Sequence, residues 1–185
     1  MIAFPKGNAA SGPSVALDGV LLLGATGRLG SMLRRHWPEP EALRSQSRQP
    51  RPGFCNFDLP AAGEGPSDAA ISAARGARAG ISLAGGTPAR AGACGAPLED
   101  NVTLALAALK LAEAAAVPRF FVASSAAVYG AQDGPLREDM PCAPLSEYGR
   151  QKLAMEQAGR EAQGKTAILA LRIGNVAGAD AILGG

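Results

Sequence analysis

The sequence predicts a doubly wound α/β fold, in which helices cover both faces of a largely parallel sheet. Short apolar runs alternate with longer helical segments, and a glycine-rich turn follows the first apolar run. Because crossovers between parallel strands are right-handed, we expect the strand order 3-2-1-4-5-6. The length of 185 residues suits one domain, to which we assign residues 17–185. Residues 1–16 mix Pro, Gly, Asn and Ser and are expected to form an irregular N-terminal arm.

The first strand and helix open a βαβ unit. The apolar run VLLL at residues 20–23 is typical of a buried parallel strand. The turn GATGRLG at residues 24–30 closes this strand. Residues 29–37 are then predicted to form a helix that stops before Pro38.

The next three strands are predicted from shorter patterns. Residues 41–45 and 54–57 form the second and third strands, and their short Pro- and Arg-rich connection leaves no room for a full crossover helix. Residues 61–79 are rich in Ala and Gly and carry few helix signals. Residues 81–84 form the fourth strand, which ends at Gly85.

The second half of the chain contains the longest predicted helices. Residues 98–116 are apolar around most of the helix circumference, which indicates burial on more than one side. The fifth strand follows Pro118 at residues 120–123. A Gly- and Pro-rich loop leads to a helix over residues 146–162, and residues 167–171 form the sixth strand.

The composition argues against several classes of function. The net charge is only +2 and the basic residues are scattered, so we expect no nucleic-acid partner. The apolar runs are too short to span a bilayer and no secretory signal is visible, so we expect no membrane association. The three cysteines lack metal-binding spacing and cannot all pair, so we expect no metal and reduced thiols in the cytoplasm. They are Cys55, Cys94 and Cys142.

The glycine turn indicates a phosphate-binding site. Gly24, Gly27 and Gly30 would allow a tight turn, a close approach of backbone to a pyrophosphate, and close helix packing. The amides at the start of the helix would then bind the pyrophosphate of a dinucleotide. The alternative is an ordinary glycine-rich turn, but the apolar strand before it and the helix after it favour the binding site.

The end of the second strand bears on the choice of cofactor. Residues 45–48 read SQSR and contain no carboxylate to accept from the ribose hydroxyls of NAD. Arg28 and Arg48 are available for the 2′-phosphate of NADP. We therefore expect NADP to be preferred over NAD, the alternative being that both arginines are solvated surface residues.

Tyr148 and Lys152 indicate proton-transfer chemistry. They lie one helical turn apart on the same helix face. There the lysine ammonium can stabilise a tyrosinate, and a hydroxyl from the upstream pair Ser124 and Ser125 can share its proton. The alternative is a surface helix with an unremarkable Tyr and Lys.

In this set of motifs the chain resembles the extended short-chain dehydrogenase/reductase family, in its NAD-dependent epimerase/dehydratase group. The resemblance covers residues 20–179. The motifs are GATGRLG at 24–30, DL at 58–59, LAG at 83–85, NV at 101–102, SSAAVYG at 124–130, the Tyr148/Lys152 pair and RIGN at 172–175.

The resemblance implies a Rossmann domain with a catalytic set. Ser125 matches the family's Ser/Thr position by its spacing to residues 128–130. The resemblance implies that Tyr148 is the general acid/base and that Lys152 also holds the nicotinamide ribose. It implies a proton-relay or structural role for Asn101, which lies in the most apolar helix.

The resemblance also implies cofactor contacts at the strand ends. Asp58 would accept from the adenine amino group, although a turn aspartate after a strand is the plain alternative. Leu83 and Gly85 would flank the cofactor, although packing and a turn are their plain roles. The expected cofactor contacts are Gly24, Thr26, Gly27, Arg28, Leu29, Gly30, Arg48, Asp58, Leu59, Leu83, Ala84, Gly85, Lys152 and Ile173.

The expected function is hydride transfer between a nicotinamide cofactor and a nucleotide sugar or another small carbonyl or carbinol compound. The substrate would meet Ser125, Tyr129 and Asn175. The alternative is a non-catalytic NAD(P)-binding or sensor protein with the same fold. Members of the family are longer, and we expect the substrate domain to be largely missing here. Surplus apolar surface on the helices at 98–116 and 146–162 predicts a homodimer through them.

Overall fold

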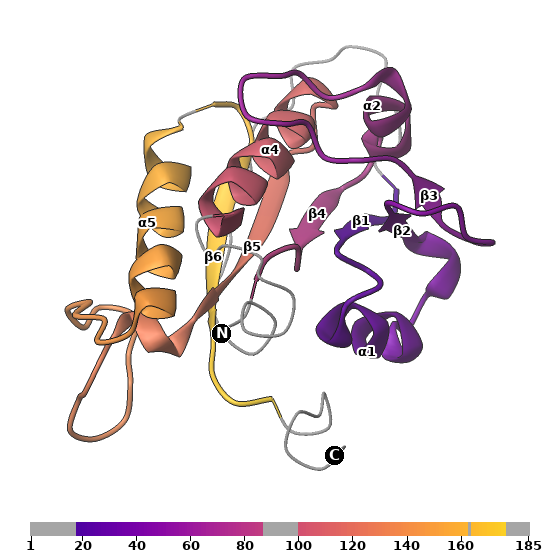
Figure 1. Cartoon of the computed structure of the whole chain (residues 1–185). Coiled ribbons are helices and arrows are strands. Elements are labelled where there is room, and N and C mark those ends of the chain that lie inside the picture. Colours follow the sequence, from indigo (N-terminus) through magenta and orange to yellow (C-terminus); the bar gives the residue numbers. More distant parts are fainter. Residues whose placement is uncertain (1–17, 87–99, 163, 177–185) are drawn as a thin grey trace, which may run out of the picture.

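The computed structural model describes residues 18–86, 100–162 and 164–176, and the predicted N-terminal arm lies outside them. The described residues form a six-stranded parallel sheet in the order β3-β2-β1-β4-β5-β6, which confirms the predicted fold class (Figure 1). The strands are β1 Val20–Leu23, β2 Leu43–Ser47, β3 Cys55–Asn56, β4 Ala79–Ser82, β5 Arg119–Ser125 and β6 Ala167–Ile173. The helices are α1 Arg28–His36, α2 Asp68–Ala74, α4 Asp100–Ala114 and α5 Glu147–Glu161, with the 3-10 turns η1 Pro40–Ala42 and η2 Ala126–Val128.

The helices lie on both sides of the sheet. The chain steps one way from β1 to β2 and the other way from β4 through β5 to β6. Right-handed crossovers therefore place α1 on one face and α4 and α5 on the opposite face. α4 and α5 pack side by side and against β5, while α1 lies apart from them (Figure 1). The carboxyl ends of the strands all point to one edge of the sheet, where the candidate site lies.

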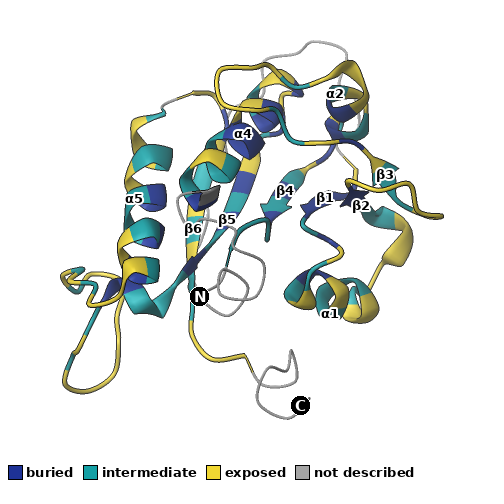
Figure 2. Ribbon diagram, viewed as in Figure 1, coloured by how far each residue is buried: buried dark blue, intermediate teal, exposed yellow. Residues whose placement is uncertain are grey.

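The core is deepest at the centre of the sheet. All of β1 is buried, which explains its wholly apolar sequence (Figure 2). Phe120 of β5 is buried, and its ring occupies the space where Gly80 of β4 would carry a Cβ. At the sheet edge, by contrast, Leu169 and Leu171 of β6 are 51% and 39% exposed.

Some element boundaries differ from the sequence expectation. β2 begins two residues later than predicted because Pro40 starts the turn η1, and β3 is only two residues long. β4 lies two residues earlier than predicted, since its ladder with β1 already begins at Ala79. α2 forms inside the Ala- and Gly-rich segment because the Ser67 hydroxyl accepts from the Ala70 amide at 3.3 Å and caps the helix.

The described ranges contain neither a helix that could span a membrane nor a cluster of metal-binding side chains. No helix in these ranges is both long enough and apolar enough to cross a membrane. Within the same ranges, His, Cys, Asp and Glu side chains form no group of three or more that could hold a metal ion.

Candidate functional site

The glycine turn joins the end of β1 to the start of α1. Gly24 has a φ of +71°, and a Cβ there would lie 2.7 Å from the Ala84 amide nitrogen. A Cβ on Gly30 would lie 2.7 Å from the Cα of Ala25. Gly27 caps α1 without a side-chain hydrogen bond. The turn therefore has no room for side chains at Gly24 and Gly30, and no side chain of the Gly27 cap occupies the first amides of α1.

The end of β2 is polar and internally bonded. Ser45, Gln46 and Ser47 are all buried. The side-chain nitrogen Nε2 of Gln46 donates to the Phe57 carbonyl at 2.7 Å. The side-chain oxygen Oε1 accepts from the backbone amide of Gly24 at 3.3 Å. Ser45 accepts from Arg34 at 2.9 Å. These contacts connect the end of β2 to the glycine turn and α1.

The charged residues expected at this edge are more peripheral. Arg28 and Arg48 are exposed. Asp58 is exposed as well, just after β3, while Leu59 packs against the hydrophobic core. Arg28, Arg48 and Asp58 are thus accessible to a ligand, whereas Leu59 is part of the packing around the core.

A hollow of about 170 Å³ lies where the ends of β4, β5 and β6 meet α5 and the start of α1. It gathers seven of the predicted site residues, although they come from five different segments of the chain. These residues are Leu29, Leu83, Gly85, Ser125, Tyr148, Lys152 and Ile173.

The start of α5 is held firmly against the end of β5. The Ser146 hydroxyl accepts from the Gly149 amide at 3.1 Å and caps the helix. A Cβ on Gly149 would lie 2.5 Å from the Ala127 carbonyl oxygen and 2.9 Å from the Cβ of Pro144. This packing brings Tyr148, on the first turn of α5, beside Ser125 at the end of β5, where both line the hollow and hydrogen bonding to Ser125 acts to lower the pKa of the phenol.

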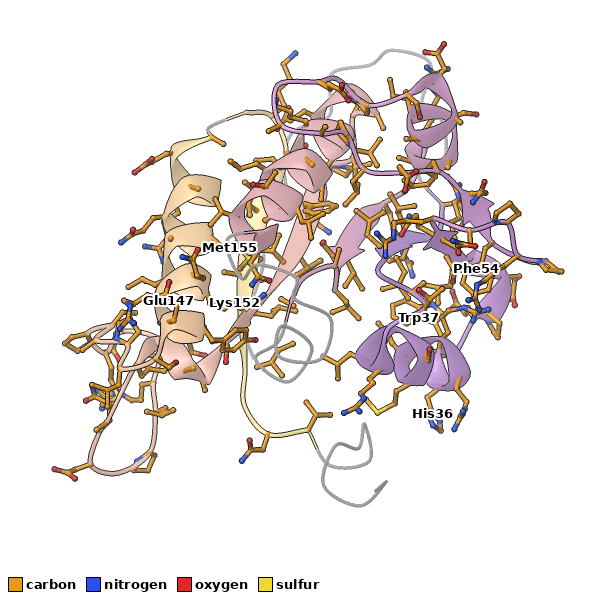
Figure 3. All side chains as sticks on the ribbon, in the orientation of Figure 1. His36, Trp37, Phe54, Glu147, Lys152 and Met155 are labelled. Carbon is orange, nitrogen blue, oxygen red and sulfur yellow. The ribbon has the colours of Figure 1, made fainter. Side chains whose placement is uncertain are left out.

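Lys152 is buried beneath the tyrosine. It is 4% exposed, its ammonium donates to the Ala123 carbonyl at 2.8 Å, and its Nζ lies 5.8 Å from the centre of the Tyr148 ring. Figure 3 shows Lys152 and Met155 on the side of α5 that faces the rest of the domain. Burial lowers the pKa of Lys152 to about 8.

The pKa of Tyr148 is raised, which differs from the expectation of a tyrosinate. Burial raises it, and the hydrogen bond with Ser125 only partly opposes this effect. Among the protein's own groups, therefore, desolvation outweighs the stabilisation of the phenolate that Ser125 provides.

Asn101 lies next to this site rather than in it. Its side chain is fully buried, its oxygen accepts from the Gly86 amide at 3.0 Å, and its nitrogen donates to the Gly86 carbonyl at 3.4 Å. A Cβ on Gly85 would meet the Asn101 oxygen and would lie 3.5 Å from Lys152 Nζ. Asn101 thus holds the backbone of the segment that lies beside Lys152. Its role in a proton relay stays a prediction.

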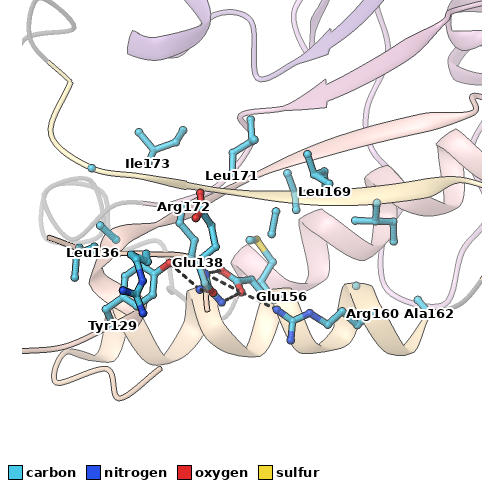
Figure 4. A pocket seen from close by; sticks show the side chains of 18 of the residues that line it. Tyr129, Leu136, Glu138, Glu156, Arg160, Ala162, Leu169, Leu171, Arg172 and Ile173 are labelled. Carbon is cyan, nitrogen blue, oxygen red and sulfur yellow. Dashed lines mark hydrogen bonds and ion pairs between the residues drawn. The ribbon is translucent and has the colours of Figure 1, made fainter. Parts of the chain in front are cut away.

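The expected substrate residues other than Ser125 are not gathered here. Tyr129 lines a second, larger hollow of about 1240 Å³ between α5 and β6, where its hydroxyl accepts from Arg172 at 2.9 Å (Figure 4). Asn175 is exposed just after β6. Their contact with substrate stays a prediction.

Sequence reasoning assigned no role to Glu156 and Arg172. The Glu156 side chain is 0% exposed and Arg172 donates to it at 2.8 Å. Two signals were present: Glu156 lies one turn after Lys152 on the same helix face, and Arg172 interrupts the apolar run of β6.

Comparisons with known proteins agree with this geometry. Residues 20–182 match the NAD dependent epimerase/dehydratase family. The UDP-glucose 4-epimerase of Azospirillum brasilense is 40% identical over 85 residues, which make up 44% of this chain and 24% of that protein. The UDP-glucose 4-epimerase of Rhizobium leguminosarum bv. trifolii is 39% identical over 85 residues, or 44% of this chain and 26% of that protein.

The solved structures give a similar result. MoeE5 in complex with UDP-glucuronic acid and NAD superposes with a TM-score of 0.66 and 28% identity, covering 83% of this chain and 54% of that chain. The chain therefore spans about a quarter of the length of the matched epimerases and about half of MoeE5. Because the family match includes the glycine turn and the residues around Tyr148, this chain belongs to the NAD dependent epimerase/dehydratase family.

Proposed function

We propose that this domain binds a nicotinamide dinucleotide and supplies the proton-transfer group of an enzyme that transforms nucleotide sugars by hydride transfer. The observation that carries the proposal is the meeting of Ser125, Tyr148 and the buried Lys152 in one hollow, which also reaches Leu29 of the glycine turn. The matched UDP-glucose 4-epimerases and the MoeE5 complex with UDP-glucuronic acid and NAD support the substrate class.

The residues at the glycine turn fit a dinucleotide. Added Cβ atoms at Gly24 and Gly30 would meet backbone, so the turn presents main chain rather than side chains at the start of α1. Such a helix start favours the negative charge of a pyrophosphate. Lys152 and Leu83 line the hollow expected to hold the nicotinamide end.

The chain's own contribution to the reaction is proton transfer. When bound, the nicotinamide ring takes a hydride from the substrate or returns one. The raised pKa of Tyr148 keeps its phenol protonated at neutral pH, ready to donate a proton to a substrate oxygen. In the opposite direction, the Ser125 hydrogen bond and the positive charge of Lys152 stabilise the phenolate that receives a proton.

The preferred cofactor is NADP. Support comes from the absence of a carboxylate in β2 and from the exposed side chains of Arg28 and Arg48. Calorimetric titration with both dinucleotides should give tighter binding of NADP, and replacing both arginines by Met should remove the difference. Equal affinities in the unaltered chain, or tighter binding of NAD, would contradict this preference.

Two further parts of the proposal concern the surroundings of the domain. A homodimer through α4 and α5 is supported by the partial exposure of Leu104 and Leu106 on α4, and light scattering over a range of concentrations measures it. A cytoplasmic location, in which Cys55 and Cys142 stay reduced, is likewise part of the proposal.

The test of the function uses Tyr148→Phe, which removes the hydroxyl and keeps the ring. Dinucleotide affinity should survive, while interconversion of UDP-glucose and UDP-galactose should fall by about 10²-fold or more. Unchanged turnover in the variant would refute the assignment of Tyr148. Tight dinucleotide binding without any turnover in the unaltered chain would favour the non-catalytic alternative.

A further inference from the structure

Three consecutive residues of β5 each lie beside a different residue of α5. Ser125 and Tyr148 line the same hollow, and the Ala123 carbonyl accepts from Lys152 at 2.8 Å. The Ser124 hydroxyl donates to Glu156 Oε1 at 2.5 Å. Tyr148, Lys152 and Glu156 are spaced four residues apart, so one helix face makes all three contacts.

Of the three α5 residues, Glu156 has the most hydrogen bonds to other parts of the domain. Its carboxylate is fully buried and accepts from Arg172 Nη2 at 2.8 Å and Nε at 3.0 Å, in addition to the Ser124 hydroxyl. Burial alone would raise the pKa of Glu156, but the hydrogen bonds from Arg172 and Ser124 hold it below its usual value. The carboxylate therefore stays charged, and its bonds are of the strong, charge-assisted kind.

Arg172 connects Glu156 to the segments that precede α5 in the chain. Its Nη1 donates to the Tyr129 hydroxyl at 2.9 Å and to the Glu138 carbonyl at 3.2 Å. Its guanidinium carbon also lies 4.8 Å from the centre of the Tyr129 ring. One side chain at the end of β6 thus joins α5, the turn η2 and the loop that leads to Ser146 (Figure 4).

We propose that Glu156 and Arg172 are positioning residues that fix the register of α5 against β5, and that through Ser124 they hold Ser125 in contact with Tyr148. Glu156 and Arg172 do not line the hollow that contains Tyr148, whereas Ser124 does. Ser124 and Ser125 are adjacent in β5, so a shift of Ser124 moves Ser125 directly. The inference rests on the proposed role of Tyr148 as the proton carrier.

The experiment measures the pKa of the Tyr148 phenol by ultraviolet absorbance during an alkaline titration. The chain has only two tyrosines, so comparison with Tyr148→Phe assigns the signal. Glu156→Gln and Ser124→Ala should each raise the pKa of Tyr148, because the opposing hydrogen bond from Ser125 is weakened. Where turnover is measurable, kcat should fall about tenfold or more with dinucleotide affinity retained, since a small misplacement of a reacting group costs rate.

Arg160 provides the matched control. It also donates to Glu156 Oε2, at 3.3 Å, but its side chain is 69% exposed and it bonds neither to Tyr129 nor to the loop. Arg160→Met should leave the pKa of Tyr148 unchanged, whereas Arg172→Met should raise it and Arg172→Lys should restore part of the change.

The outcomes separate this inference from the proposed function. If Ser124→Ala and Glu156→Gln fold and leave the pKa of Tyr148 unchanged or lower it, the inference is wrong. If Glu156→Gln does not fold, Ser124→Ala decides alone, because it leaves the ion pair intact. The titration does not require enzymatic turnover. An inactive chain would therefore count against the proposed function, while the titration could still confirm or refute the positioning role of Glu156 and Arg172.

Discussion

The glycine turn and the start of α5 lie at the same edge of the sheet but are built in opposite ways. At residues 24–30 the geometry requires glycine, because added Cβ atoms at Gly24 and Gly30 would meet main-chain atoms. In α5 the geometry depends on particular polar atoms, since Lys152 and Glu156 are hydrogen-bonded to β5 and Tyr148 lies beside Ser125. Substitutions should therefore act through steric overlap in the first region and through hydrogen bonds and charge in the second.

The largest effect is expected at Gly30. Gly30→Ala would place a methyl group against the Gly24 carbonyl and the Ala25 backbone, which cannot move like the end of a flexible side chain. Overpacking of this kind costs about 1–3 kcal/mol or more, and urea unfolding measures it. Dinucleotide binding should be lost as well, because α1 is displaced.

The matched control for Gly30 is Gly65. A Cβ there meets no atom within 4 Å, and Gly65 has no positive φ. Gly65→Ala should change the free energy of unfolding by no more than about 0.5 kcal/mol. Equal costs at Gly30 and Gly65 would show that the glycine turn is not limited by steric overlap.

The next effect concerns Lys152 and pH. Its pKa is lowered in the folded chain from 10.5 to about 8, so the unfolded chain binds more protons between these values. The free energy of unfolding should therefore rise with pH from about 8 to about 10, by at most about 3 kcal/mol. Above that range the raised pKa of Tyr148 acts in the opposite direction, because the folded chain then holds the extra proton.

Lys152→Met should flatten this rise, as measured by urea unfolding at a series of pH values. The exposed Lys110 on α4 serves as the control, and Lys110→Met should keep the slope of the unaltered chain. If Lys152→Met keeps the full slope, burial of the ammonium is not its cause.

The same contrast explains what the sequence could predict. The strand order followed from right-handed crossovers, and the meeting of Tyr148 with Ser125 followed from a helix face and a strand end. The Glu156–Arg172 pair did not follow, because it joins a helix to a strand and depends on the packing of both. The raised pKa of Tyr148 was missed for a related reason, since burial is a property of the folded surroundings and not of residue spacing.

The smallest effect is expected at Ser146, and it separates the stability of α5 from the positioning of Tyr148. Ser146 caps α5 by accepting from Gly149 at 3.1 Å, and Ser67 caps α2 by accepting from Ala70 at 3.3 Å. Replacing either serine by Ala should cost about 1 kcal/mol in urea unfolding. Only Ser146→Ala should also change the titration of the Tyr148 phenol, because only that cap sets the first turn of α5. If Ser67→Ala altered the phenol titration equally, the effect would reflect global stability, and local positioning by the start of α5 would be refuted.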